Sequence, residues 1–371
     1  MSAQSLVIKI KKNKFAYYFI APALIGMVLL NFIPFMQGFY MSFLKLNLHT
    51  MDRYLSAPFV NWGNYYDVLF NPNSPVRIGL GQAVRNTLYY SVFVTIGQLG
   101  MGLIVALMLN RDFRGRSVIR TLFLFPWIVP TFVTGLLWGF MWQQDIGIIN
   151  YLLYDIPLVK ALFFNVFHIH DIINIINAII TLLINVLLFP ISYTLGLVGV
   201  EFKYAVENIF PLLPAFTSEI KPAWLTGPNT FWAIVVPTIW RFWPLSMLML
   251  LAGLQNIPDS LYEAASIDGA SSWKKFWHIT VPMLKSVWAI LLMFGIIYNV
   301  YSFNIVIMMF GNGAGFPGEW GDLMMTNIFR NSFQQWNFGN GAAISIMFMA
   351  FMSIVIYYWH KFYISSEEIY R

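Results

Sequence analysis

Few side chains in this sequence have the types and spacing that metal binding or catalysis requires. His168, His170 and Asp171 form the one compact group of metal-ligating residue types. A catalytic zinc ion needs three protein ligands and an open position. With no cysteine and 5 histidines in the whole chain, no third ligand can be placed beside the two histidines. We therefore predict neither a metal site nor a membrane metalloenzyme, and we interpret the group as a polar patch.

Other catalytic chemistry is also excluded. Because cysteine is absent, the chain has no disulfide, no thiolate nucleophile and no cysteine metal site. The phosphate-binding pattern G-x-x-x-x-G-K-[ST] is missing, so we expect no ATP hydrolysis by this chain. The net charge of +6 comes mainly from basic residues in short connecting segments, which is not a nucleic-acid signature. The sequence predicts no catalytic residue, no cofactor in this chain and no nucleic-acid partner.

The polar segment Glu263–Gly269 carries the clearest local signals, and two long apolar runs flank it. Ser260 and Glu263 have the spacing of a capping box, which predicts a helix from about Leu261. Gly269 can adopt the left-handed conformation that ends such a helix and turns the chain. The small side chains that follow Glu263 would let another surface approach closely. We expect a short helix that a soluble partner can reach.

A second short helix is predicted directly after this turn. Ser271 or Ser272 can cap it, and Pro282 fits near the start of the next apolar run. The whole segment would then be a helix-turn-helix along a membrane surface. An ordinary amphipathic connector is the alternative interpretation, because a three-residue match such as Glu-Ala-Ala is common by chance.

The elements around this loop are membrane spans. The 371 residues are 58% hydrophobic and 10% charged, whereas a soluble domain carries about 25% charged residues. A helix needs roughly 20 apolar residues to cross a bilayer, and several runs are long enough. We predict an all-α polytopic membrane protein.

Six core spans are predicted from the apolar runs, at residues 15–43, 84–109, 121–142, 231–253, 286–310 and 341–363. Basic residues set topology, because connections rich in Lys and Arg stay in the cytoplasm. This rule places the N-terminus 1–14, the arginine-rich connection after residue 110, the loop 254–285 and the tail 364–371 inside. The loop 44–83 lies outside, between the first two spans of the region 15–150.

Residues 151–230 interrupt this scheme with another apolar stretch, at 172–200. A single crossing there would place a basic connection on the wrong side. The segment must cross an even number of times, or lie on or dip into the outer leaflet. We favour an extracytoplasmic insertion that leaves the topology of the region 231–363 unchanged.

Several motifs together resemble the permease subunits of binding-protein-dependent carbohydrate-uptake ABC importers. Besides the Glu263 loop and the Ile279-Thr280-Val281-Pro282 that follows it, they are Leu250–Pro258, Trp224–Asn229, Asn61–Tyr65 and Phe338-Gly339. The chain looks most like the maltose-permease F type. It departs from the family at residues 311–317, where the family often has a Gly-Gly-Gly-Pro turn, and in the insertion. Both departures lie on the predicted outer side.

The resemblance implies a type I ABC importer fold in the bacterial inner membrane, with the N-terminus inside. It implies transport of a sugar or oligosaccharide that an extracytoplasmic solute-binding protein delivers. The other partners would be a second, different permease and two copies of a cytoplasmic ATPase, which would bind the ATP and magnesium. In such a complex the ATPase-coupling residues of this chain are Glu263, Ala264, Ala265, Asp268 and Gly269.

Arg241 is the one cation in the middle of a predicted span. Such charges are costly in a membrane and usually face a cavity or a partner. Aromatic and polar neighbours make a reasonable sugar surface, and a cationic cavity would suit an acidic sugar. The candidate substrate path is Trp240, Arg241, Trp243, Tyr298, Asn299, Tyr301 and Asn304. The alternative is that Arg241 pairs with a backbone carbonyl or reaches the interface, and that the other side chains pack.

Two other transporter classes stay open. A secondary transporter usually shows internal repeats, which are not evident here, and it has no use for a docking loop. An ABC permease for a non-sugar solute would share the loop. Copurification of an ATPase separates the first alternative, and substrate assays separate the second.

Overall fold

A computed structural model of the chain describes residues 14–182, 213–214, 217–310 and 315–368. The described residues are helical and contain no β-strand, with one isolated bridge between Leu44 and Phe59. Among the described residues, four helices are long and apolar enough to span a membrane, and three bent helix pairs raise the count to as many as 7. The all-α class and the membrane character predicted from the sequence are confirmed.

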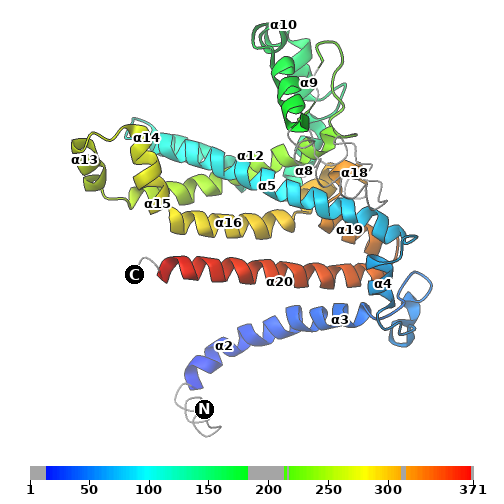
Figure 1. The fold of residues 1–371 in the computed structure, drawn as a ribbon. Coiled ribbons are helices and arrows are strands. Elements are labelled where there is room, and N and C mark those ends of the chain that lie inside the picture. The colour runs from blue at the N-terminus through cyan, green and yellow to red at the C-terminus, as the bar shows by residue number, and fades with distance from the viewer. Residues whose placement is uncertain (1–13, 183–212, 215–216, 311–314, 369–371) are drawn as a thin grey trace, which may run out of the picture. The chain divides into compact units, whose positions relative to one another are not determined.

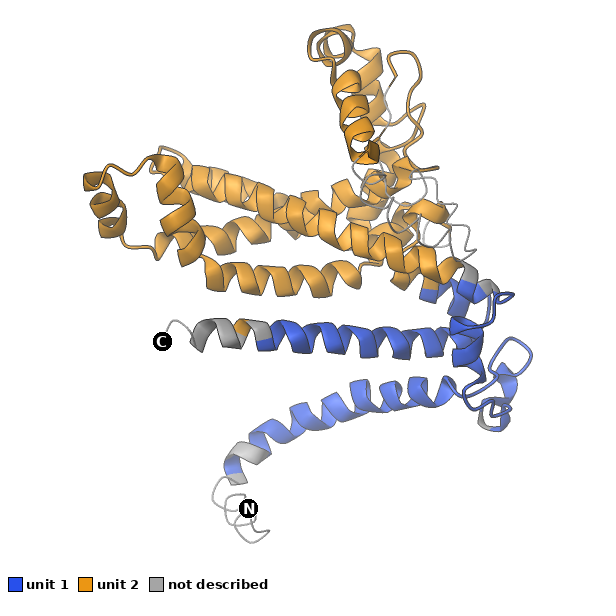
Figure 2. Ribbon diagram, viewed as in Figure 1, with its two compact units in different colours: residues 1–78, 328–361 blue, residues 79–327, 362–371 orange. Residues whose placement is uncertain are grey.

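The chain divides into two compact units (Figure 2). Unit 1 comprises residues 1–78 and 328–361, and unit 2 comprises residues 79–327 and 362–371. The helices of unit 1 are α2 (Lys14–Met27), η1 (Val28–Phe32), α3 (Ile33–Met41), η2 (Met51–Ser56), α4 (Gly63–Leu69), η8 (Arg330–Gln334) and most of α20 (Phe338–Glu368). The predicted first and sixth spans lie in α2–α3 and α20.

Two of the sequence motifs meet inside unit 1. The Asn64 side-chain amide donates to the carbonyl oxygens of Ser42 and Leu44, at 2.8 Å each. The backbone amide of Gly339 donates to the carbonyl oxygen of Leu46 at 3.0 Å. These bonds satisfy backbone carbonyl groups in the irregular chain that follows α3. The motifs at Asn61–Tyr65 and Phe338-Gly339 thus join α4 and α20 to the chain that follows α3.

Unit 2 carries the other spans. They are α5 (Pro75–Leu109), which begins in unit 1, the bent series α6 (Arg116–Phe123), α7 (Phe125–Ile128) and α8 (Thr131–Met141), then α12 (Asn229–Gln255) and α16 (Lys285–Val300). Figure 1 shows α5, α12 and α16 side by side. The break between α7 and α8, at Val129 and Pro130, bends the predicted third span by 88°.

Glycines allow these helices to approach closely. A Cβ atom on Gly102 of α5 would lie 2.7 Å from Ser246 of α12, and one on Gly295 of α16 would lie 2.9 Å from Thr95 of α5. Small residues at such crossings are the usual means of packing helices in lipid. Apolar side chains fill the rest of the interior, in one cluster around Phe231 and another around Met247.

The predicted fifth span differs from the structure. The run 286–310 reads as one apolar segment, yet α16 ends at Val300 and a separate helix, α17 (Asn304–Met309), follows. A Cβ atom on Gly135 of α8 would lie 2.6 Å from the carbonyl oxygen of Ile305. One on Gly139 of α8 would lie 3.0 Å from the carbonyl oxygen of Met309. Helix α17 therefore packs on α8 instead of extending α16.

The remaining helices lie in the connections between the spans. They are α9 (Ile148–Asn150), η3 (Tyr151–Asp155), α10 (Pro157–Lys160), η4 (Ala161–Val166), the helix Ile169–Leu182, α13 (Asp259–Ile267), α14 (Ser272–Lys275), η6 (Phe276–Thr280), α15 (Val281–Met283), α18 (Gly318–Gly321) and α19 (Met324–Phe329). Residues 183–200 of the predicted apolar stretch lie outside the described residues.

Candidate functional site

Helix α13 contains the predicted coupling segment, and its start differs from the prediction. The helix begins at Asp259, with Pro258 as the N-cap residue in an extended conformation and no side-chain cap. Ser260 lies inside the first turn, so the predicted capping box is wrong. The Asp259 carboxylate instead complements the positive end of the helix dipole.

The end of α13 follows the prediction closely. Gly269 has φ +73°, in the left-handed region. The amide of Ala270 donates to the carbonyl oxygen of Ala265 at 2.8 Å, and the amide of Gly269 donates to that of Ser266 at 3.1 Å. This pair of bonds is a Schellman motif, which satisfies the last carbonyl groups and turns the chain sharply.

The predicted coupling residues lie together on an open surface. Glu263, Ala264, Asp268 and Gly269 are exposed, and Ala265 is half-buried. Beside them the side chain of Ile267 is 88% exposed. So large an exposed fraction is unusual for an isoleucine. Neither carboxylate, of Glu263 or Asp268, forms an ion pair within the described part of the chain. The surface is therefore free to meet another molecule.

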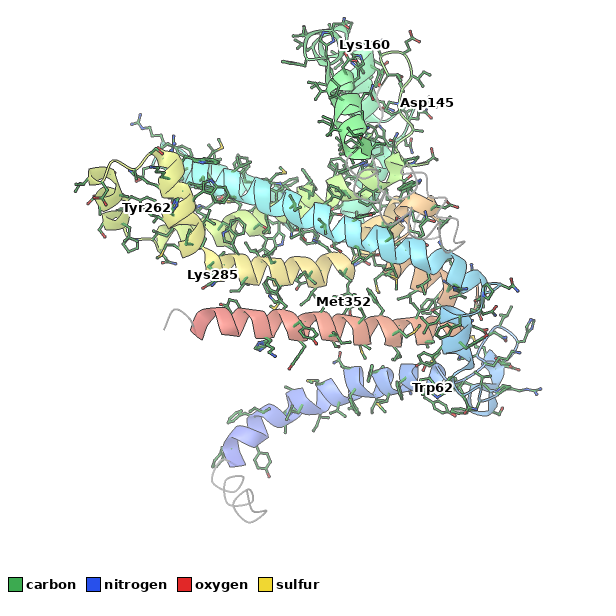
Figure 3. All side chains as sticks on the ribbon, in the orientation of Figure 1. Trp62, Asp145, Lys160, Tyr262, Lys285 and Met352 are labelled. Carbon is green, nitrogen blue, oxygen red and sulfur yellow. The ribbon has the colours of Figure 1, made fainter. Side chains whose placement is uncertain are left out.

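The opposite side of α13 is fixed to the spans. The Tyr262 ring packs against the apolar cluster around Met247, and its hydroxyl group lies 2.9 Å from that of Thr280 in η6. The Lys275 ammonium group donates to the Ser266 hydroxyl. Figure 3 shows Tyr262 between α13 and the α14–α15 series that leads into α16. The side chain of Tyr262 thus joins α13 to η6, in the chain that leads through α15 into α16.

The second short helix is held by its predicted cap. The Ser271 side chain accepts from the amide of Lys274 at 3.4 Å, which confirms one of the two serines proposed from the sequence. Pro282 lies in the first turn of α15, also as expected. The bend between Ser272–Met283 and α16 is 67°. The helix-turn-helix therefore lies across the end of the span.

Both ends of unit 2 can be assigned to particular connections (Figure 1). Helix α12 runs from Asn229 to Gln255 and leads into α13. The arginine-rich connection between α5 and α6 lies at the same end as α13 and α14. Helices α9 and α10 lie at the opposite end. The two basic connections of this unit therefore share one side, as the positive-inside rule requires.

The mid-span arginine has no hydrogen-bond partner at two of its nitrogens. Nε and Nη1 of Arg241 are shielded from solvent without a partner among the described residues, and the guanidinium lies 5.5 Å from the centre of the Phe242 ring. A charged group left so in a membrane is costly. Arg241 thus has unused capacity for an acceptor.

The other candidate path residues separate into packed and exposed ones. Trp243 is buried against Phe123, and Trp240 contacts Trp138 edge to face. Asn299 is buried and donates to the Thr95 hydroxyl at 2.9 Å. Tyr298, Tyr301 and Asn304 are exposed. The structure does not gather these side chains around one space.

The sequence analysis did not predict a buried polar cluster formed by Tyr90, Thr238 and Ser302. The Tyr90 hydroxyl lies 2.7 Å from that of Thr238 and 2.9 Å from that of Ser302, so it joins α5 to α12 and to the chain after α16. A signal for it was available, because Thr87, Ser91 and Thr95 recur every 4 residues along one face of α5. Such a stripe within an apolar helix marks its contact with other helices.

The histidine patch is held by Asp171. Its carboxylate lies 3.3 Å from Nδ1 of His168 and 3.3 Å from Nε2 of His170. Within the described part of the chain no group of three or more such residues has the geometry to hold a metal ion.

Comparison with known proteins adds independent information. The sequence profile of the "binding-protein-dependent transport system inner membrane component" family matches residues 98–365. The trehalose/maltose transport system permease protein MalF of Thermococcus litoralis is 28% identical over 365 residues, covering 95% of this chain and 94% of that protein. The sn-glycerol-3-phosphate transport system permease protein UgpA of Brucella suis is 25% identical, with 93% of each chain covered.

A solved structure has the same fold. One chain of a bacterial ABC transporter that imports the acidic polysaccharide alginate superposes with a TM-score of 0.66. The match covers 96% of this chain and 98% of that one, at 18% identity. The helical arrangement of the two chains is therefore alike.

Proposed function

Since the chain belongs to the family of inner-membrane components of binding-protein-dependent transport systems, we propose that it is the permease subunit of an ATP-driven importer for a sugar or oligosaccharide. The observation that carries the proposal is α13, an exposed helix clamped to the ends of the spans by Tyr262. The permease relatives are named for trehalose, maltose and sulfoquinovosyl glycerol, which makes a glycoside the first substrate to test.

In this mechanism the chain works with several partners. An extracytoplasmic binding protein delivers the solute, and this chain and a second, different permease form the path. Two cytoplasmic ATPase subunits bind ATP and magnesium, and the surface around Glu263 and Ile267 docks on one of them. The N-terminus and α13 lie on the cytoplasmic side, as the basic connections favour.

Energy coupling then follows from the geometry of α13. A helix closed by a Schellman motif and hydrogen-bonded to η6 moves as a unit. Closure of the ATPase subunits displaces α13, and the Tyr262–Thr280 contact passes the displacement to α16. ATP biases a two-state switch between outward-facing and inward-facing arrangements.

A second candidate is an anionic solute. Arg241 has two guanidinium nitrogens without a partner among the described residues, and the similar proteins include permeases for sn-glycerol 3-phosphate. Carboxylate and phosphate groups are the natural acceptors for a guanidinium. In this version Arg241 binds the charged group, and the exposed Tyr298, Tyr301 and Asn304 line the path.

The test is the ATPase activity of the purified complex in lipid. We would measure it with and without candidate binding proteins loaded with neutral glycosides, acidic glycosides or glycerol phosphates. We expect stimulation by one class, which is lost when Glu263 is replaced by Lys. Failure of any ATPase to copurify would contradict the proposal and would leave a secondary transporter as the alternative.

A further inference from the structure

The segment between α8 and α12 leaves unit 2 and returns to it at one place. The ring of Trp142, just after α8, contacts the ring of Trp224, just before α12, in a tilted arrangement with ring centres 4.5 Å apart. The Asn150 side chain donates to the carbonyl oxygens of Gln144 and Pro222 and accepts from Nε1 of Trp224. Asn150 is fully buried. Both ends of the segment are therefore locked to the end of the spans that lies opposite α13.

The described part of this segment has the composition of a membrane helix. Residues 148–166, in the bent pair Ile148–Asp155 and Pro157–Val166, meet the same criterion of hydropathy and charge as the spans. The pair bends by 75°, and an apolar helix, Ile169–Leu182, follows. We call residues 148–182 the apolar arm. Each described helix of the arm, Ile148–Asp155, Pro157–Val166 and Ile169–Leu182, is shorter than the roughly 20 residues that a crossing takes.

Large apolar side chains of the apolar arm point away from the protein. Leu158 is 70% exposed, Val166 is 61% exposed and Ile175 is 59% exposed. Others along the arm are similarly exposed, among them Tyr151, Phe167, Ile172, Ile179 and Leu182. An apolar surface this extensive marks contact with a membrane or a protein. Figure 1 shows the α9–α10 part directed away from the line of α5 and α12.

The arm carries three charged side chains, Asp155, Lys160 and Asp171, and both carboxylates have a partner. Asp155 accepts from the ammonium group of Lys221 at 2.7 Å. Asp171 lies between His168 and His170. Lys160, at the far end of the arm in Figure 3, has a long stem that can carry its charge to the headgroup layer. An arm in water could carry many unpaired charges. In lipid an unpaired charge is costly, so few charges are expected and those present should be paired.

We propose that the apolar arm lies in the membrane leaflet on the side opposite α13. The arm is embedded in the lipid of that leaflet and does not cross the bilayer. Lipid is favoured over a protein partner because residues 148–166 of the arm are as apolar as the spans themselves, and the helix Ile169–Leu182 is apolar too. The arm would bury its apolar side chains at the boundary of headgroups and acyl chains, as amphipathic interfacial helices do. The proposal does not depend on the solute or on the ATPase.

The absence of native cysteine makes the test direct. Single cysteines at Leu158, Val166 and Ile175 would each carry a nitroxide label, in the full chain with its copurified partners in lipid nanodiscs. Collision rates with oxygen, which concentrates in lipid, and with a water-soluble nickel chelate would then be compared. Matched controls are Leu88, a 51% exposed residue of α5, for lipid, and Asp145, exposed at the base of the arm, for water.

We expect all three arm labels to resemble the Leu88 label, with an oxygen-to-nickel collision ratio several-fold above that at Asp145. Equal access to the nickel chelate at the arm and at Asp145 would overturn the proposal in favour of a water-exposed arm. Shielding from both reagents would overturn it in favour of a protein partner. Three sites keep the test valid if one variant fails to assemble, and the result stands even if no ATPase copurifies.

Discussion

The hydroxyl groups of Tyr262 and Thr280 lie 2.9 Å apart and connect α13 to η6, 18 residues further along the chain. The aromatic ring of Tyr262 is packed against the apolar interior while the same side chain reaches across the turn at Gly269. This one contact joins the exposed helix to the chain that enters α16. It is the structural reason to expect that α13 transmits force.

Replacing Tyr262 with Phe keeps the ring packing and removes the hydrogen bond. Such a bond contributes about 0.5–1.5 kcal/mol, so we expect a several-fold loss of solute uptake per ATP hydrolysed, with normal assembly of the complex. Thr280→Val removes the same bond from the other side. If the bond is what matters, the double variant is no worse than either single one. Independent, additive losses would contradict this role.

Gly269→Ala tests the turn that ends α13. A left-handed residue with a Cβ atom costs roughly 1–2 kcal/mol, and no atom lies within 4 Å of the position that the Cβ atom would take, so strain is the only effect. We expect reduced uptake with Ala, partial recovery with Asn, and abolished uptake with normal membrane insertion for Gly269→Arg. Uptake would be measured in reconstituted vesicles.

The matched control for this turn is Gly115→Ala. Gly115 has φ +86° and equally open surroundings, but it lies between α5 and α6. The control carries the same backbone strain outside the coupling segment and should keep nearly normal uptake. Equal losses at the two glycines would show that strain alone, and not the position in α13, lowers transport.

Gly135→Ala tests the packing of α17 on α8. The added Cβ atom would lie 2.6 Å from the carbonyl oxygen of Ile305, a backbone atom that has little freedom to move. Overpacking of this kind typically costs about 1–3 kcal/mol, so the melting temperature of the purified complex should fall. Gly100→Ala in α5 meets nothing within 4 Å and should leave it unchanged or raise it. A fall at Gly100 equal to that at Gly135 would contradict the packing argument.

Arg241→Met separates a transport role from a structural one. Because two guanidinium nitrogens have no partner in the part of the chain that the structure describes, removing the charge should leave the complex as stable as the native one, or more stable, by thermal melting. We expect uptake of the solute to fall at least about tenfold, because the variant loses one charge-assisted hydrogen bond to the solute. Such a bond contributes roughly 1.5–3 kcal/mol. Arg241→Lys, which keeps the charge, should retain part of the uptake. Unchanged uptake in the Met variant would assign Arg241 to packing alone.

Local signals explain which parts of the fold were predictable. The apolar runs identified the spans, and Gly269 and Ser271 had the positions that a helix end and a helix start require. The start of α13 was misplaced by two residues, because Asp259 and Ser260 offer competing signals at a helix N-terminus. The positive-inside rule also predicts that the two basic connections of unit 2 lie on one side, as they do in the structure.

Contacts between distant residues explain the rest. The division of the predicted fifth span depends on Gly135 and Gly139 of α8, far away in the sequence, and hydropathy contains no record of that contact. The hydrogen bond between Asn299 and Thr95 also joins residues far apart in the sequence. The sequence therefore could not show that the Asn299 side chain is bonded inside the protein. The ring contact between Trp142 and Trp224, which joins the two ends of the insertion, is a distant contact of the same kind.

The most direct test of the central claim is a site-specific photo-crosslink from Ile267, the 88% exposed residue of α13. A benzophenone amino acid at this position, in the complex purified from cells, should attach this chain to an ATP-hydrolysing subunit. The same probe at Leu48, an exposed residue of the predicted outer loop, should not. A crosslink to lipid alone, or none in a complex that still transports its solute, would contradict the assignment of α13 as the ATPase-docking helix.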